Sequence, residues 1–88
     1  MIRYLIDGKR VDTKKLILLY DDCRAYHAQY FLMSKNKKRF FIEKETWMLT
    51  KHYNEIFEIS RKEMINALTE AVCPDRAKYG LELMGAGK

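Results

Sequence analysis

Cysteine and histidine, the side chains that zinc prefers as ligands, occur at four positions of this 88-residue sequence, which are Cys23, His27, His52 and Cys73. A structural zinc site usually draws its ligands from closely spaced pairs, and only Cys23 and His27 approach such a spacing. Cys73 lies at the end of a predicted helix, where a buried thiol acts as a small apolar side chain. We therefore expect no metal site and no other cofactor.

Carboxylates are the second group that suggests chemistry, because a metal-dependent nuclease needs several of them together, usually with a lysine near the attacking water. The candidates are Asp21, Asp22, Glu43 and Glu45. No E-x-K or H-x-H pattern occurs on the predicted strands, and solvated charges at strand ends explain these residues more simply. Neither cysteine has a histidine neighbour in a catalytic context. We expect no catalytic residues.

The most informative feature is a basic hairpin over residues 26–43, in which two aromatic runs flank a polar connector. Its four positive charges are Lys35, Lys37, Lys38 and Arg39. Through Phe40 the sequence has ten Lys and Arg against four Asp and Glu, whereas the remainder has seven against eight. Such a local positive field attracts phosphate backbones and acidic protein surfaces. We predict that these four residues contact a partner.

Aromatic residues on the hairpin strands would stack on single-stranded bases if they were exposed. However, residues 38–42 lack the glycine spacing of sheet-based RNA binders, and aromatic side chains on central strands usually belong to the core. Trp47 is a further candidate contact residue. If exposed, it would form an apolar protein-binding patch with Met33 and Met48. The alternative is that these three side chains pack under a helix.

Length and composition indicate one domain that folds on its own. Hydrophobic residues make up 48% and charged residues 33% of the chain, which are ordinary globular values. The two distant cysteines favour a reduced, cytoplasmic setting. No apolar stretch approaches the length of about 20 residues that a membrane span requires, so we expect no membrane association.

The first half of the chain predicts short antiparallel strands. Residues 2–6 favour a strand, Asp7-Gly8 favours a type I′ turn, and residues 9–11 return antiparallel. Residues 14–20 fit either a short helix or a buried strand, and Asp21-Asp22 predicts a break.

The basic hairpin pairs residues 25–33 with residues 39–44. Asn36 is expected to adopt the left-handed conformation that its turn needs. Since neither face of residues 26–33 is purely polar, the hairpin should be central and partly covered on both sides.

The clearest helix follows a strand over residues 55–59, whereas residues 46–53 have no clear assignment. Ser60 and Glu63 form a capping box at the start of this helix, which should extend from Arg61 to Cys73 until Pro74 stops it. Residues 75–84 fit a short helix or a strand, and residues 85–88 should form a flexible tail after the single domain of residues 1–84. The predicted fold class is α+β, with a small antiparallel sheet packed against a C-terminal helix.

Several segments together resemble small uncharacterised accessory proteins of phages and mobile elements of Gram-positive bacteria. The segments are residues 6–13, the hairpin of residues 31–42, Leu49-Thr50-Lys51 and residues 59–63. The Gly-rich segment common after the hairpin in such proteins is replaced here by residues 43–47. The resemblance implies an accessory protein in a bacterial cytoplasm that acts by binding, and it carries over no catalytic residue.

We therefore expect a non-enzymatic binding protein, an inhibitor or modulator of a bacterial nucleic-acid-handling or defence machine in the manner of anti-CRISPR proteins. Its partner would be a bacterial protein or nucleoprotein complex, with direct nucleic-acid contact as an open question. The alternative is a small basic DNA- or RNA-binding regulator, and a small metal-dependent nuclease is a distant third. The sequence does not determine the oligomeric state.

Overall fold

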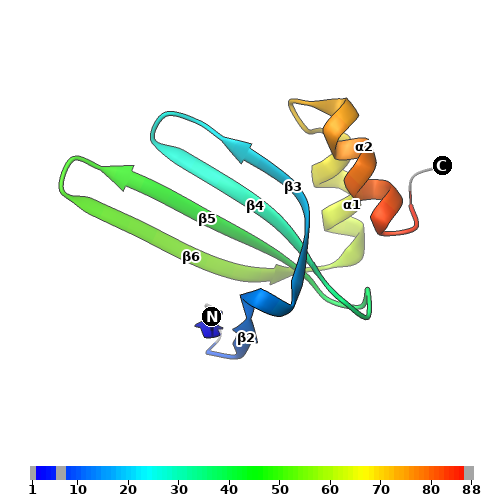
Figure 1. Cartoon of the computed structure of the whole chain (residues 1–88), viewed down its shortest axis with the longest axis horizontal. Coiled ribbons are helices and arrows are strands. Elements are labelled where there is room, and N and C mark those ends of the chain that lie inside the picture. The colour runs from blue at the N-terminus through cyan, green and yellow to red at the C-terminus, as the bar shows by residue number, and fades with distance from the viewer. Residues whose placement is uncertain (1, 6–7, 87–88) are drawn as a thin grey trace.

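The computed structural model describes residues 2–5 and 8–86 and shows an α+β fold with two C-terminal helices (Figure 1). Its sheet is an antiparallel meander of four strands in the order β3 (Leu16–Cys23), β4 (His27–Ser34), β5 (Phe40–Met48) and β6 (Lys51–Ile59). The predicted fold class is confirmed, because an antiparallel sheet precedes the C-terminal helices in the chain.

A separate two-stranded hairpin precedes the sheet, and it pairs β1 (Ile2–Tyr4) with β2 (Arg10–Asp12). The predicted return strand is thus confirmed, although it begins one residue later than expected. Gly8 has a φ of 88°, which glycine adopts without steric cost. Asp7, the other residue of the predicted turn, lies outside the described residues.

Residues 14–20 divide between a helical turn and a strand. A 3₁₀ turn, η1 (Thr13–Lys15), is capped by the Asp12 carboxylate, which accepts a hydrogen bond from the Lys14 N–H at 3.1 Å. β3 then runs through Asp21-Asp22, so the predicted break at these residues is wrong. The strand tolerates them because their carboxylates form ion pairs at the sheet edge, with Arg76 and Arg24 respectively.

The central hairpin of β4 and β5 is confirmed, with Leu32 opposite Phe41. The strand predicted at residues 55–59 is also confirmed, but it starts earlier, at Lys51. Residues 46–53 therefore form the end of β5, a tight turn and the beginning of β6.

Alternating side chains of the central strands point into two separate cores. On one face the sheet packs against the helices, through a cluster that includes Phe31, Met33, Phe40, Met64 and Leu68. On the other face it packs against the β1–β2 hairpin, through Leu5, Val11, Leu32, Phe41 and Ile56. The expectation that the central hairpin is covered on both sides is confirmed.

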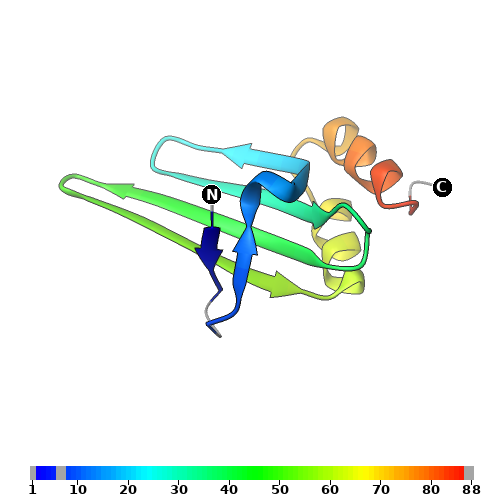
Figure 2. The same ribbon diagram turned by 60° about the horizontal axis from the view of Figure 1, so that its bottom comes forward.

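The helices lie at one end of the sheet, which we call the proximal end; it holds the β4–β5 turn. Figure 2 shows the β1–β2 hairpin crossing the sheet nearer its middle, while the β3–β4 and β5–β6 turns project from the opposite, distal end beyond both covers. Burial follows this division along β5, where Phe40, Phe41 and Ile42 are buried and Trp47 and Met48 are exposed.

The first helix begins at the predicted residue, but it ends earlier than predicted and a second helix follows it. α1 (Arg61–Thr69) starts with the capping box, in which the Ser60 hydroxyl accepts the Glu63 N–H at 3.1 Å and the Glu63 carboxylate accepts the Ser60 N–H at 3.0 Å. The helix ends at Thr69 rather than at Cys73. Pro74 does not stop α1 but opens α2 (Pro74–Leu83), since its missing N–H and fixed φ suit the first helical turn.

α2 lies directly against β3. A Cβ atom at Gly80 would come within 2.5 Å of the Leu19 carbonyl oxygen, so only glycine permits this approach. Gly85, with a φ of 80°, ends the helix, and the Ala86 N–H donates to the Leu81 carbonyl at 2.9 Å. The last two residues of the predicted tail, 87 and 88, lie outside the described residues.

Candidate functional site

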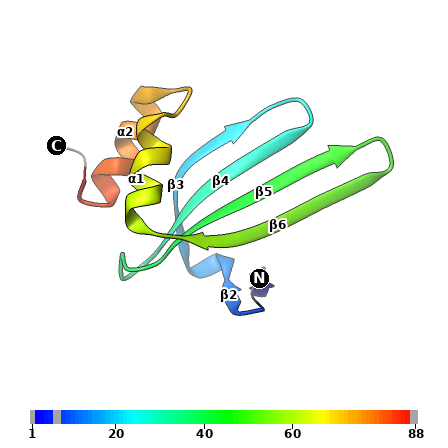
Figure 3. The ribbon, with the colours of Figure 1, turned by 180° about the vertical axis from the view of Figure 1, so that it is seen from behind.

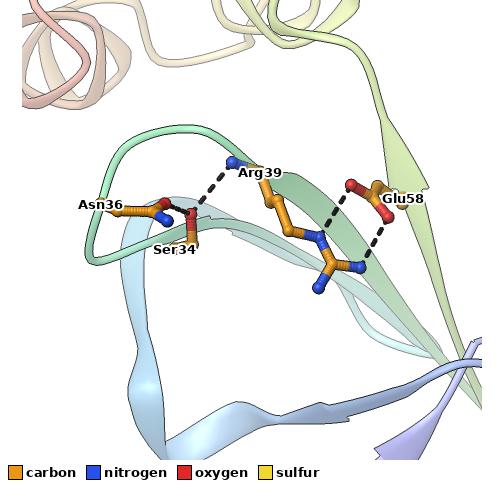
Figure 4. Close-up of polar contacts among 4 residues, drawn as sticks. All are labelled: Ser34, Asn36, Arg39 and Glu58. Atoms are coloured by element: carbon orange, nitrogen blue, oxygen red, sulfur yellow. Dashed lines mark hydrogen bonds and ion pairs between the residues drawn. The ribbon is translucent and has the colours of Figure 1, made fainter.

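The β4–β5 turn, which carries the predicted contact residues, is fixed by its own polar groups (Figure 4). The Ser34 hydroxyl accepts the Arg39 N–H at 2.9 Å and donates to the Asn36 side-chain oxygen at 2.6 Å. That oxygen also accepts the Lys38 N–H at 3.0 Å. The turn therefore presents its lysines from a rigid backbone.

Lys37 occupies the left-handed position in this turn, with a φ of 63°. The expectation that Asn36 would do so is wrong, because the Asn36 side chain instead folds back as a hydrogen-bond acceptor for Ser34 and Lys38. A left-handed lysine costs about 1 kcal/mol relative to its preferred conformations. The hydrogen bonds of the turn hold this strained backbone in place.

Arg39 differs from the three exposed lysines in that it is half-buried and has a fixed acidic partner. Its guanidinium donates two hydrogen bonds to Glu58, at 3.1 and 2.8 Å, and lies 5.0 Å from the centre of the Phe41 ring. Its charge is therefore used largely within the molecule, and its role is to connect β5 to β6.

A second basic segment lies beside this turn. Because Leu16 pairs with Ser34, the chain of β2 and η1 runs next to residues 34–39. A surface pocket of about 480 Å³ lies between them, and its lining includes Arg10, Lys15 and Lys35. We define the basic surface as six exposed residues, Arg10, Lys14, Lys15, Lys35, Lys37 and Lys38.

Sequence reasoning missed the first three of these residues. The signal was present in the adjacent pair Lys14-Lys15, but only the register of β3 on β4 places that pair beside the Lys35 turn. Asp12 lines the same pocket, and its carboxylate caps the backbone of η1 at the Lys14 N–H.

Trp47 lies at the opposite end of β5 from the lysine turn, so the five predicted contact residues do not form one surface. The indole is 40% exposed and stacks on the His52 ring with centroids 5.6 Å apart. It lines an apolar pocket of about 650 Å³, and we define the apolar tip as the large side chains around it, Tyr26, Trp47, Met48 and Leu49. Met33, predicted to accompany Trp47, is instead fully buried in the helix-side core.

The candidate carboxylates are engaged separately and do not converge. Besides the two aspartates at the β3 edge, Glu43 accepts a hydrogen bond from Asn54 at 2.9 Å, and Glu45 lies 2.9 Å from the His52 ring nitrogen. A hydrogen bond from the Tyr30 hydroxyl to Glu45, reinforced by partial burial, raises the pKa of Tyr30 to about 12. These contacts form a row of cross-strand pairs on the sheet.

The candidate zinc ligands show no convergence either. Within residues 2–5 and 8–86, no three His, Cys, Asp or Glu side chains are grouped so that they could hold a metal ion. Cys23 and Cys73 are both exposed. The expectation of a buried Cys73 is wrong, because α1 ends before it and the residue precedes α2 in the connecting segment.

In the part of the chain that the structure describes, no helix has the length and apolar character needed to cross a membrane. Comparisons with protein-family models, with curated proteins and with solved structures found no match.

Proposed function

We propose that this chain is a non-enzymatic binding protein of a phage or mobile element that inhibits or modulates a bacterial nucleic-acid-handling or defence machine, as anti-CRISPR proteins do. The observation that carries the proposal is the basic surface, where cations from two segments far apart in the sequence meet around one pocket. Its function is to contact the phosphates of a nucleoprotein target in the bacterial cytoplasm.

The electrostatics of the basic surface support contact with an external anion. None of its six side chains forms a salt bridge or hydrogen bond with another described side chain. The Asp12 carboxylate, which lines the same pocket, attracts Lys15, and the surface as a whole keeps an excess of positive charge. Lys35, Lys37 and Lys38 are held at a rigid turn, which reduces the entropy lost when they bind. Phosphate groups suit such a surface because each contact releases bound counterions.

The apolar tip supports a protein component in the target. Leu49 is fully exposed and Met48 is 62% exposed, and such side chains gain little from the phosphate groups of a nucleic acid but gain free energy when a protein surface covers them. The two surfaces lie at opposite ends of the sheet (Figure 1). The molecule measures 43 × 29 × 19 Å, and the sheet extends along its longest dimension. A target that offers both phosphate and protein surface fits this arrangement better than naked nucleic acid.

The experiment compares two double variants with the same change in charge. Lys35→Glu/Lys38→Glu alters the basic surface, whereas Lys62→Glu/Lys78→Glu alters exposed lysines of the helices. Wild type and both variants are used to capture partners from a bacterial lysate, with and without nuclease treatment. We expect the first variant to bind the captured partner at least about tenfold more weakly and the second to bind normally.

Three outcomes separate the alternatives. Capture of a protein or nucleoprotein complex, lost in the first variant only, supports the inhibitor. Direct binding to purified DNA or RNA with steep salt dependence, lost in the same variant, indicates the basic regulator instead. Equal partner affinity for the wild type and a folded Lys35→Glu/Lys38→Glu variant would remove the basic surface from the function.

A further inference from the structure

The two edges of the sheet are protected very differently. At β3, the pairing with β4 is irregular between Leu18 and Tyr20, and α2 lies against the strand. Arg76 of α2 donates a hydrogen bond to the Asp21 carbonyl at 3.1 Å, which uses an acceptor of the outer edge. Bulges and covering helices are the usual means by which proteins prevent pairing at an edge.

The edge formed by β6 has no comparable protection. The strand pairs with β5 over nine consecutive positions without a shift in register, and it contains no proline. Figures 1 and 3 show that no described element runs along the outer side of the half of β6 next to the β5–β6 turn. A long, regular and open edge of this kind is a template for another strand.

The hydrogen-bond pattern determines which groups this edge offers. The backbones of Arg39 and Trp47 bond to β4, so the odd-numbered residues of β5 point toward β4 and the even-numbered ones toward β6. Tyr53 pairs with Thr46 and therefore points its backbone toward β5. The alternation leaves the N–H and C=O groups of His52 and Asn54 directed outward.

We propose that β6 pairs antiparallel with β6 of a second copy of this chain, about a two-fold axis at Tyr53. This register places His52 opposite Asn54 of the second copy, so that the outward backbone groups of each strand meet those of the other. It also places Lys51 opposite Glu55 of the second copy, and the symmetry repeats each pair. The two sheets become one continuous eight-stranded sheet.

Charge complementarity selects this register from those that the backbone permits. Lys51 and Glu55 are exposed, and neither forms an ion pair with another described residue. Moving the axis to Asn54 would place Lys51 opposite Phe57 of the second copy, and moving it to Glu55 would place two glutamates opposite each other. Directly opposed like charges destabilise a sheet, whereas opposite charges stabilise it.

Charges on an edge strand commonly serve only to prevent aggregation. In β6, however, the opposite charges stand at equal distances on either side of Tyr53, whose side chain is 50% exposed. The symmetric register therefore pairs two half-exposed aromatic rings and flanks them with two ion pairs. Edge protection alone does not require this symmetry.

The test uses charge reversal at the two positions. Sedimentation velocity of the wild type between about 1 and 500 µM, a range that covers weak association, should show a monomer–dimer equilibrium. Lys51→Glu and Glu55→Lys should each weaken the dimer at least about tenfold, because each variant opposes like charges twice. An equimolar mixture of the two variants should recover association, because every Glu then faces a Lys.

Lys62→Glu is the matched control for charge and should dimerise like the wild type. Circular dichroism and thermal unfolding verify that the variants fold. Lys51→Glu should disturb folding less than Glu55→Lys, because Lys51 pairs with Met48 of β5, whereas Glu55 pairs with Lys44 and its replacement by lysine would oppose two positive charges. A wild type that stays monomeric throughout the range overturns the proposal. Variants that dimerise normally, or a mixture that fails to recover association, overturn this register.

Discussion

Arg39, directly before β5, lies beside Glu58 of β6, and the arginine donates one hydrogen bond to each carboxylate oxygen, at 3.1 and 2.8 Å. This pair joins the end of the lysine turn to the last part of β6 (Figure 4). Two parallel N–H···O bonds fix both side chains more firmly than a single contact would. The arginine therefore belongs to the scaffold of the turn, while the lysines before it face solvent.

Arg39→Gln should lower the free energy of unfolding without a matching loss of partner binding. Because the pair is partly exposed, its coupling energy in a double-mutant cycle with Glu58→Gln should be about 0.5–1 kcal/mol. Urea unfolding of the four proteins measures this energy. If Arg39→Gln instead weakens partner binding as strongly as Lys35→Glu/Lys38→Glu, Arg39 is a contact residue and not a scaffold residue.

Lys37→Gly should stabilise the protein or leave it unchanged, although a loop lysine is replaced by the most flexible residue. Glycine removes the left-handed strain of about 1 kcal/mol, which offsets its larger entropy in the unfolded chain. Lys35→Gly is the control, because Lys35 does not have a positive φ and gains no such relief. Thermal unfolding compares the two variants, and a lower melting temperature for Lys37→Gly than for Lys35→Gly would contradict the prediction.

Gly80→Ala should destabilise the protein by about 1–3 kcal/mol, since a new methyl group forces packed backbones apart. The atom that it meets is a backbone carbonyl oxygen of Leu19, which cannot move without shifting β3. Lys78→Ala, at an exposed position of the same helix, should change stability by less than about 0.5 kcal/mol. Chemical unfolding of both variants tests the packing of α2 on the sheet; equal stabilities would show that α2 can move away from β3.

Ser60→Ala should cost about 0.5–2 kcal/mol of stability, because it leaves the Glu63 N–H without its capping oxygen. Thr69→Ala is a control at the other end of α1. The Thr69 hydroxyl donates a hydrogen bond to the Ile65 carbonyl, and the stability of the helix does not depend on this bond. Equal losses from the two substitutions would argue against a special role for the capping box.

The other half of the capping box makes stability depend on pH. The hydrogen bond from the Ser60 N–H lowers the pKa of Glu63 in the folded protein. The ionised Glu63 therefore contributes its full stabilisation above the pKa of about 4.3 that it has in the unfolded chain. This stabilisation is lost as the pH falls through the lower pKa that Glu63 has in the folded protein. Glu63→Gln should reduce the difference in stability between neutral and acidic solution, as measured by urea unfolding. An unchanged difference would mean that other carboxylates account for the acid dependence.

Structural features that depend only on residues close together in the sequence were predictable from the sequence. The capping box needs only Ser60 and Glu63, and the central hairpin shows its alternation within one segment. Pro74 was misinterpreted because proline can follow one helix or begin the next, and the sequence around it does not distinguish the two. The assignment of residues 14–20 depended on burial by α2, which is distant in the sequence.

The candidate site was predictable only in part for the same reason. Lys35, Lys37 and Lys38 are close in sequence and were found directly. Arg10 and Lys15 join them only because a β-sheet register brings the two segments together. Trp47 was assigned to the same contact set, but its position nine residues beyond Lys38 on an extended chain separates it from the lysines.

The covers leave the distal end of the sheet open, and this gives the molecule a gradient of local stability. Around Phe40 and Phe41, both faces are covered, so exchange of the backbone amide protons with solvent requires cooperative unfolding. Trp47 and Met48 are exposed to solvent, and short-lived opening of the two distal turns exposes the amides there without disturbing the rest. A partner that covers the apolar tip would suppress this opening, and part of its binding free energy would be spent on ordering the strand ends.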